Sequence, residues 1–188
     1  MPGLTLWRNF ISAAEEAVLL QSVNAEPWSS ALRRRTQHYG FEYDYRTRQL
    51  PARLGPLPDW SSVLVERMVE REIYANATPP NQLIVNEYVP GQGISAHTDS
   101  PVFASPIVSV SLGSVVVMDF SLPASAGAPA KTVNLVLPRR SAIVLSGEAR
   151  SRWRHAIAAR YHDVYSGMRH ERTTRVSLTF RIVPNAAS

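Results

Sequence analysis

The chain has 188 residues, 45% of them hydrophobic, and carries a formal net charge of +5. That length suits a single domain with a substantial core, and no apolar run approaches the roughly 18 residues that a membrane span needs. Cysteine is absent, which excludes disulfides, thiolate metal sites and cysteine nucleophiles.

The first predicted element is a helix that follows the N-terminal ten residues. Residues 1–10 lack the charged start and long apolar stretch of a signal peptide, so a cytoplasmic location is expected. Ser12 and Glu15 have the spacing of a capping box, which marks the start of a helix. The apolar stripe of this helix is predicted to consist of Ala17, Leu20 and Val23.

Arginines and aromatic residues are interleaved between residues 33 and 53. Arginine supplies cations for phosphate and aromatic rings stack on an extruded base, so this segment is predicted to bind nucleic acid. The alternative is a hairpin whose alternate aromatic residues pack on the core. The positive net charge suits a polyanion partner, although a GC-rich coding bias would also favour arginine over lysine. The candidate substrate residues are Arg34, Arg35, Tyr39, Phe41, Tyr43 and Tyr45.

A second helix is predicted to begin at Asp59, after a proline. Its apolar residues recur at helical spacing, so one face should pack against a core. Those residues are Trp60, Leu64, Val65, Met68, Val69 and Ile73. The prolines at positions 79 and 80 are expected to stop this helix.

From residue 82 onward the hydrophobic period changes to two, which predicts short strands. Clusters of Gly, Pro and Ser separate them, as in a sandwich, jelly roll or barrel. The helices are confined to the N-terminal part, so the predicted class is α+β with a mainly β core, in a single domain of residues 1–188. The predicted strands are residues 83–89, 107–112, 115–120, 132–137, 142–145, 154–158 and 175–183.

Two imidazoles and one carboxylate are candidate metal ligands. His97 and Asp99 are two residues apart, so on an extended segment their side chains point the same way. His155 is the best third ligand, although a histidine on a partly apolar strand face can also be a satisfied core residue. The other histidines are expected in loops or at the surface, and these are His38, His162 and His170.

This ligand set suits non-haem Fe(II), because it leaves up to three open positions that a 2-oxo acid and O₂ can fill. A zinc hydrolase normally uses three protein ligands and one water. The three ligands alone therefore permit zinc as well as iron.

The predicted strand of residues 175–183 separates polar from apolar residues by parity. Its polar face carries two arginines, whose planar forks suit a small dicarboxylate better than lysine does. On the strand of residues 83–89, Asn86 and Tyr88 share one face and predict a second wall of the same pocket. The alternative is an amphipathic edge strand with solvated arginines. The polar face consists of Arg175, Ser177, Thr179 and Arg181.

In this order, these motifs resemble the AlkB family of Fe(II)/2-oxoglutarate oxygenases, and the ordered set is more specific than any single motif. The matching segments are Asn86-x-Tyr88, Pro90-Gly91, His97-x-Asp99, residues 107–113, residues 146–150, His155 and Arg175-x₅-Arg181. The likeness extends to the AlkB domains of eukaryotic tRNA wobble-uridine hydroxylases at residues 37–41, 57–59, 117–120 and 137–141.

The resemblance implies a double-stranded β-helix, a relative of the jelly roll, at about residues 82–183. N-terminal helices and a nucleotide-recognition lid would occupy about residues 1–81, with residues 33–53 as the lid. It implies that His97, Asp99 and His155 hold Fe(II), with Arg181 near the metal and Arg175 on the distal carboxylate of 2-oxoglutarate. The co-substrate residues implied are Asn86, Tyr88, Arg175, Ser177, Thr179 and Arg181.

The implied activity is that of a dioxygenase, which uses O₂ to convert 2-oxoglutarate to succinate and CO₂ while hydroxylating a C–H bond of the substrate. An N-methyl group treated in this way leaves as formaldehyde. The expected partner is nucleic acid, as a single strand or a flipped base carrying an alkylated or modified group, with RNA or tRNA slightly favoured over DNA. No membrane and no protein partner are expected. The alternatives are an oxygenase of protein side chains or small molecules, and a non-catalytic nucleic-acid-binding module.

Overall fold

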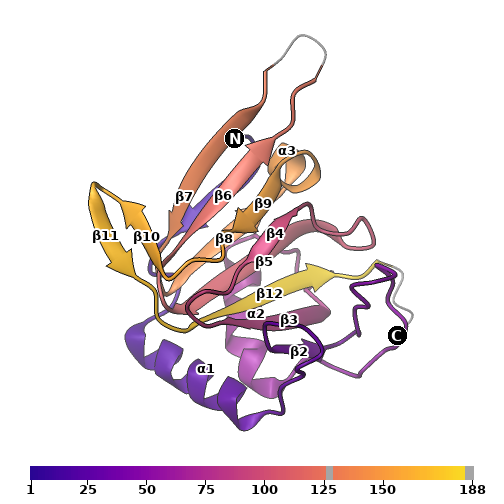
Figure 1. Cartoon of the computed structure of the whole chain (residues 1–188). Helices are drawn as coiled ribbons and strands as arrows, with labels where there is room; N and C mark the ends of the chain where they lie inside the picture. The colour runs from indigo at the N-terminus through magenta and orange to yellow at the C-terminus, as the bar shows by residue number, and fades with distance from the viewer. Residues whose placement is uncertain (126–128, 185–188) are drawn as a thin grey trace.

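The computed structural model describes residues 1–125 and 129–184 as two facing antiparallel sheets with the two N-terminal helices on one side (Figure 1). The larger sheet has six strands. In spatial order these are β1 (Leu4–Trp7), β8 (Ser141–Leu145), β5 (Ala104–Gly113), β12 (Arg175–Ile182), β3 (Gln82–Tyr88) and β2 (Thr36–Tyr39). The smaller sheet has the order β4 (Ile94–His97), β9 (Arg154–Ile157), β6 (Val116–Leu122) and β7 (Lys131–Leu137).

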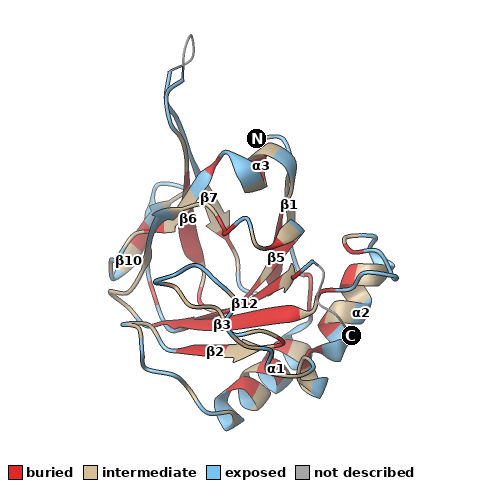
Figure 2. Ribbon diagram, turned by 90° about the vertical axis from the view of Figure 1, so that its right-hand side faces the viewer, coloured by how far each residue is buried: buried red, intermediate tan, exposed pale blue. Residues whose placement is uncertain are grey.

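This arrangement confirms the predicted α+β class with a mainly β, jelly-roll core. Two large apolar cores hold the layers together, and the buried central strands stand out in Figure 2. One core lies between the outer face of the larger sheet and the helices, and includes Val176, Leu178 and Phe180 of β12. The other lies between the two sheets, and includes Met118 and Phe120 of β6. The polar face of β12 therefore turns toward the smaller sheet.

Helix α1 (Ala13–Ala25) begins as predicted, with the capping box of Ser12 and Glu15 fully formed. Its buried face differs from the prediction, because the buried residues are Glu16, Leu19 and Val23. Ala17 is exposed. A charged residue occupies this face because Glu16 accepts hydrogen bonds from the Gly113 amide and from Arg139.

The second helix is shorter than predicted. A 3₁₀ turn, η1 (Asp59–Ser61), leads into α2 (Ser62–Glu70), which buries Leu64 and Met68 against the first core. The helix ends at Glu70, well before the prolines, and Glu72 has a left-handed backbone with φ of 56°. Within the described ranges, no helix is long and apolar enough to cross a membrane.

Three expectations on the C-terminal half and the histidines are corrected. Helices are not confined to the N-terminal part, because α3 (Gly147–Ser151) follows β8. His162 and His170 lie in a hairpin, β10 (His162–Tyr165) with β11 (Met168–Glu171), and not in a loop. The charges of that segment pair internally, since Arg172 donates to Asp163 at 2.7 and 2.8 Å. His38 lies in β2 and is partly buried.

Candidate active site

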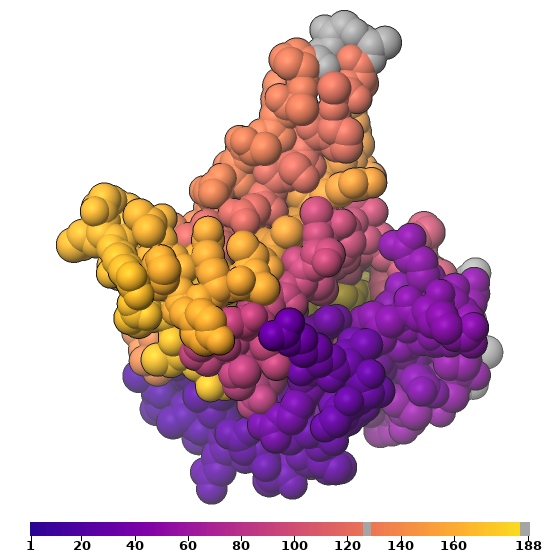
Figure 3. All heavy atoms as spheres, viewed as in Figure 1, coloured from indigo at the N-terminus to yellow at the C-terminus, as the bar shows by residue number. Residues whose placement is uncertain are grey.

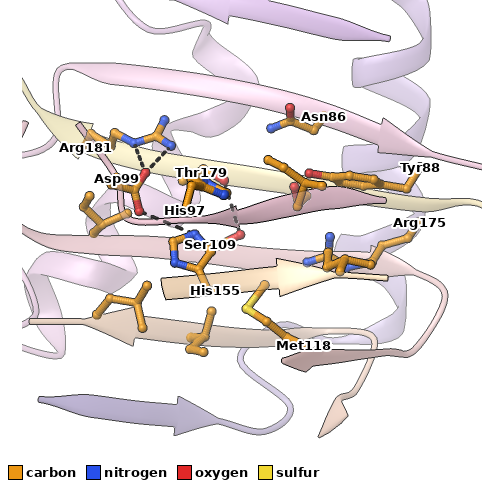
Figure 4. Close-up of a pocket in the computed structure, with 16 residues that line it drawn as sticks. Asn86, Tyr88, His97, Asp99, Ser109, Met118, His155, Arg175, Thr179 and Arg181 are labelled. Carbon is orange, nitrogen blue, oxygen red and sulfur yellow. Dashed lines mark hydrogen bonds and ion pairs between the residues drawn. The ribbon is translucent and has the colours of Figure 1, made fainter. Parts of the chain in front are cut away.

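A cavity of about 70 Å³ lies between the two sheets, on the polar face of β12 (Figure 4). Strand pairing places Tyr88 of β3 beside Arg175 of β12, and Asn86 beside Ser177. The two arginines of β12 lie at opposite ends of the cavity in Figure 4. All nine side chains predicted for metal and co-substrate line it, namely Asn86, Tyr88, His97, Asp99, His155, Arg175, Ser177, Thr179 and Arg181.

His97, Asp99 and His155 converge at one end of this cavity. His97 on β4 and His155 on β9 are partners in strand register, and their ring centroids are 4.4 Å apart. Asp99 follows β4 by two residues, and its Oδ2 is 3.7 Å from His155 Nε2. His97 Nδ1 is 2.7 Å from the Ser95 carbonyl, which can only accept, so Nδ1 carries a proton and Nε2 is the nitrogen left to face a metal.

The charge states of these groups suit a metal ion. Burial would raise the pKa of Asp99, but Arg181 and the two imidazoles lower it to about 2, so the carboxylate is ionised. Burial lowers the pKa of His155 to about 4 despite the neighbouring Asp99, so the imidazole is neutral. An ionised carboxylate and a neutral imidazole are donors of the kind that a divalent metal needs. In the described ranges no group of three or more such side chains stands close enough to hold a metal as it is, so these three would have to close around one.

Arg181 orients the carboxylate of Asp99. Its Nε and Nη2 both donate to Asp99 Oδ1, at 3.2 and 2.8 Å, and its third nitrogen reaches Gln82 at 3.3 Å. This leaves Asp99 Oδ2 facing His155. The guanidinium also lies 4.8 Å from the centroid of the Phe103 ring. Arg181 therefore lies at the metal end of the cavity.

Arg175 is a buried cation at the other end, with 3% of its surface exposed. Its Nη2 donates to Ser111 Oγ at 2.9 Å, and its guanidinium lies 5.5 Å from the centroid of the Tyr88 ring. Among the described residues its Nε has no hydrogen-bond partner. Burial lowers the pKa of Arg175 to about 10. A carboxylate bound here would supply the missing acceptor and the counter-charge.

Several lining residues were not predicted. Ser109 on β5 bonds Thr179 at 3.3 Å, and an apolar floor completes the cavity. For the lining residues on β5, β6 and β8, alternation was the available signal, because they share the inward parity of their strands. The floor consists of Ile94, Ile107, Met118, Ile143, Leu145 and Ile157.

A second cavity of about 540 Å³ adjoins the first, and the residues that line both are Asn86, Ile94, His97, Asp99 and Arg181. In Figure 3 the surface is hollowed between the purple segment of residues 33–53, the predicted lid, and the pink segment after β4, with yellow atoms of the C-terminal strand at the bottom. On the lid side, the cavity is lined by Leu32, Arg34, Tyr43, Tyr45 and Arg48.

The structure brings three of the six predicted substrate residues to this outer cavity, namely Arg34, Tyr43 and Tyr45. Arg34 lies 5.3 Å from the centroid of the Tyr45 ring, and the two tyrosine rings meet edge to face at 5.1 Å. Arg48 and Phe103 also line this cavity and were not among the six. The lid therefore gives the cavity an aromatic wall with two cations.

The other three predicted substrate residues point elsewhere. Arg35 forms two hydrogen bonds with Glu87, which lies on the opposite face of β3 from Asn86. The Tyr39 ring packs edge-on against Trp60. Phe41 packs against the small apolar cluster of Phe103, Ile107 and Val183. Tyr39 and Phe41 pack on the core, as the hairpin alternative predicted for the aromatic residues, and Arg35 is held by its ion pair with Glu87.

The fold and site together define an oxygenase that combines a metal with a 2-oxo acid. The model of the 2OG-Fe(II) oxygenase superfamily matches residues 3–181, and the chain belongs to that superfamily. The chain is 34% identical over 209 residues to the tRNA (carboxymethyluridine(34)-5-O)-methyltransferase alkbh8 of Xenopus tropicalis, covering 97% of this chain and 32% of that protein. It thus spans about a third of that relative's length.

Within the superfamily the chain belongs to the AlkB family. It is 31% identical over 204 residues to a protein of Danio rerio named "Probable RNA/DNA demethylase ALKBH6", covering 94% of this chain and 83% of that protein. The solved structure of OsALKBH1 superposes with a TM-score of 0.71 at 18% identity, covering 96% and 97% of the two chains, which supports the fold. Membership makes the chain a dioxygenase, with Fe(II), 2-oxoglutarate and O₂ implied by the family, and not the non-catalytic module considered above.

Proposed function

We propose that this dioxygenase oxidises an alkylated or otherwise modified base in nucleic acid, with RNA favoured over DNA. The outer cavity carries this proposal, because its aromatic and cationic wall opens directly onto the metal end of the inner cavity. The names of two relatives point the same way, one to uridine 34 of tRNA and one to RNA or DNA demethylation.

In this proposal His97, Asp99 and His155 hold the iron. When bound, the iron supplies oxidation of a substrate C–H bond by O₂, coupled to decarboxylation of 2-oxoglutarate. Arg181 keeps one oxygen of Asp99 occupied and so directs the other toward the metal. The His97 ring presents Nε2, since its Nδ1 is bonded to Ser95.

The co-substrate would lie along β12. Arg175 binds the distal carboxylate, because it is a buried cation with an unused donor. Tyr88 and Ser177 flank that position, while Thr179 lies between it and the metal end. The apolar floor excludes water from the reacting centre, which protects the oxidant from side reactions.

The target base would enter the outer cavity against the lid. Tyr43 and Tyr45 offer ring faces and edges for stacking, worth about 1–3 kcal/mol per base. Arg34 and Arg48 supply positive charge for phosphate or for a polar group on the base. A base held there faces His97 and Asp99, which line both cavities.

The test is mass spectrometry of nucleosides from tRNA and from methylated DNA after incubation with the protein, Fe(II) and 2-oxoglutarate in air. The proposal predicts a hydroxylated or demethylated nucleoside, formed together with succinate and more readily from tRNA. Succinate without any change in either nucleic acid contradicts the proposed substrate. Under that outcome a protein side chain or a small molecule becomes the substrate class to examine.

A further inference from the structure

Asn86 lies at the junction of the two cavities. It sits on β3 opposite Ser177, is 7% exposed, and lines both the inner and the outer cavity. A side-chain amide has one accepting oxygen and one NH₂ group with two donors. Its orientation therefore decides whether Asn86 offers a bound carboxylate a hydrogen-bond donor or a repelling oxygen.

Arg34 determines that orientation. Its Nε donates to Asn86 Oδ1 at 2.9 Å, across 52 residues of sequence. A guanidinium has donors and no acceptor, so it can bond only the oxygen end of the amide. The bond thereby fixes Oδ1 toward the lid and leaves Nδ2 as the group free to donate to a carboxylate.

The position of Arg34 is itself set by the lid. Its guanidinium lies over the Tyr45 ring and lines the outer cavity. Arg34 is not among the residues that line the inner cavity. Among the described residues, Asn86 is therefore the link between Arg34 and the co-substrate site.

We propose that Arg34 is a positioning residue for 2-oxoglutarate, which acts by holding the Asn86 amide with its NH₂ group toward the co-substrate. This role goes beyond contact with the nucleic-acid substrate, and it rests on the dioxygenase class and not on the identity of the base. One charge-assisted hydrogen bond lost in this way lowers the affinity for 2-oxoglutarate about 10-fold. The lid and the co-substrate wall are tied together by this bond.

The experiment is calorimetric titration of the full chain, loaded with Mn(II), with 2-oxoglutarate. Four proteins form a cycle: wild type, Arg34→Gln, Asn86→Ala and the double variant. Arg33→Gln is the matched control, because it removes the same charge from the neighbouring exposed residue. Arg34→Lys tests rescue, since lysine retains a cationic donor without the planar fork.

The dissociation constant for 2-oxoglutarate is expected to be roughly 10-fold larger in Arg34→Gln than in wild type and unchanged in Arg33→Gln. In Arg34→Lys it should lie between those two values. In the Asn86→Ala background, Arg34→Gln should add nothing, because Arg34 acts through Asn86. Unchanged affinity in Arg34→Gln, or effects of the two substitutions that simply add, would overturn the proposal. If wild type itself fails to bind 2-oxoglutarate, both this proposal and the co-substrate site are wrong. If the four proteins bind 2-oxoglutarate as expected but wild type does not oxidise nucleic acid, only the proposed substrate is contradicted.

Discussion

Arg181 holds Asp99 by a single oxygen, with Nη2 at 2.8 Å and Nε at 3.2 Å from the same Oδ1. The second oxygen, Oδ2, is thereby left 3.7 Å from His155 Nε2. Arg181 is expected among the co-substrate residues and near the metal, and its ion pair in this structure is with Asp99, a predicted metal ligand. Its strongest effect should therefore be on the metal.

Arg181→Gln is expected to weaken metal binding by about 10- to 100-fold, the usual effect of removing a partner that orients a ligand. Competition between the protein and a chelator for Mn(II) measures this directly. Arg8→Gln, an exposed substitution at the other end of the chain, is the control. Equal metal affinity in both variants would show that Asp99 needs no help from Arg181.

Arg175→Met separates binding from stability. Removing a buried cation that lacks a carboxylate partner should raise the free energy of unfolding by about 1 kcal/mol in the absence of co-substrate. In the presence of metal, 2-oxoglutarate at 100 times its dissociation constant should stabilise wild type by about 2.7 kcal/mol and the variant hardly at all.

Thermal or urea unfolding with and without 2-oxoglutarate checks both halves of this prediction. The variant also loses the hydrogen bond from Arg175 to Ser111 Oγ, and this loss limits the gain in stability. A variant that 2-oxoglutarate still stabilises as strongly as wild type would remove Arg175 from the co-substrate site.

Tyr45→Ala is expected to lower kcat/KM for a nucleic-acid substrate about 10-fold, because a stacked ring contributes about 1–3 kcal/mol. At saturating 2-oxoglutarate, its turnover in the absence of substrate should persist, since Tyr45 does not line the inner cavity. Tyr39→Phe is the matched control, because the Tyr39 hydroxyl bonds Gln37 away from the outer cavity. Equal losses in the two variants would mean that the lid acts only through its stability.

Glu16→Gln should make the protein less stable at neutral pH by about 2 kcal/mol. This is below the usual cost of breaking a buried pair, because Arg139 is half-exposed. Burial alone would raise the pKa of Glu16, but hydrogen bonds from Arg139 and the Gly113 amide lower it below the usual value of 4.5. Its contribution is therefore complete above about pH 4.5 and disappears as the pH falls through the lowered value.

Urea unfolding at several pH values between neutral and acid provides the measurement. Wild type should lose more stability than Glu16→Gln on acidification, so that the two curves converge at low pH. Parallel curves would show that Glu16 does not carry the pH dependence assigned to it.

Local periodicity was enough to predict the core of the site. On β12 the period of two placed Arg175 and Arg181 on one face and Leu178 and Phe180 on the other, and the structure has this division. The capping box at Ser12 was equally local and is present. Structural features that depend only on residues close in the sequence can be predicted from the sequence.

Features set by distant partners could not be predicted in this way. Glu16 is buried because Arg139, 123 residues away, bonds it. Arg34 and Arg35 diverge because they meet Asn86 and Glu87, which lie on opposite faces of β3. Both arginines were predicted to bind substrate, because no feature of the neighbouring sequence distinguishes them.

The most direct test of the central claim uses the protein with Fe(II) and 2-oxoglutarate under anaerobic conditions. A site built from His97, Asp99, His155 and Arg175 predicts a weak visible charge-transfer band, which disappears in His97→Ala, and succinate when air is admitted to wild type. Absence of both the band and succinate in wild type would contradict the account.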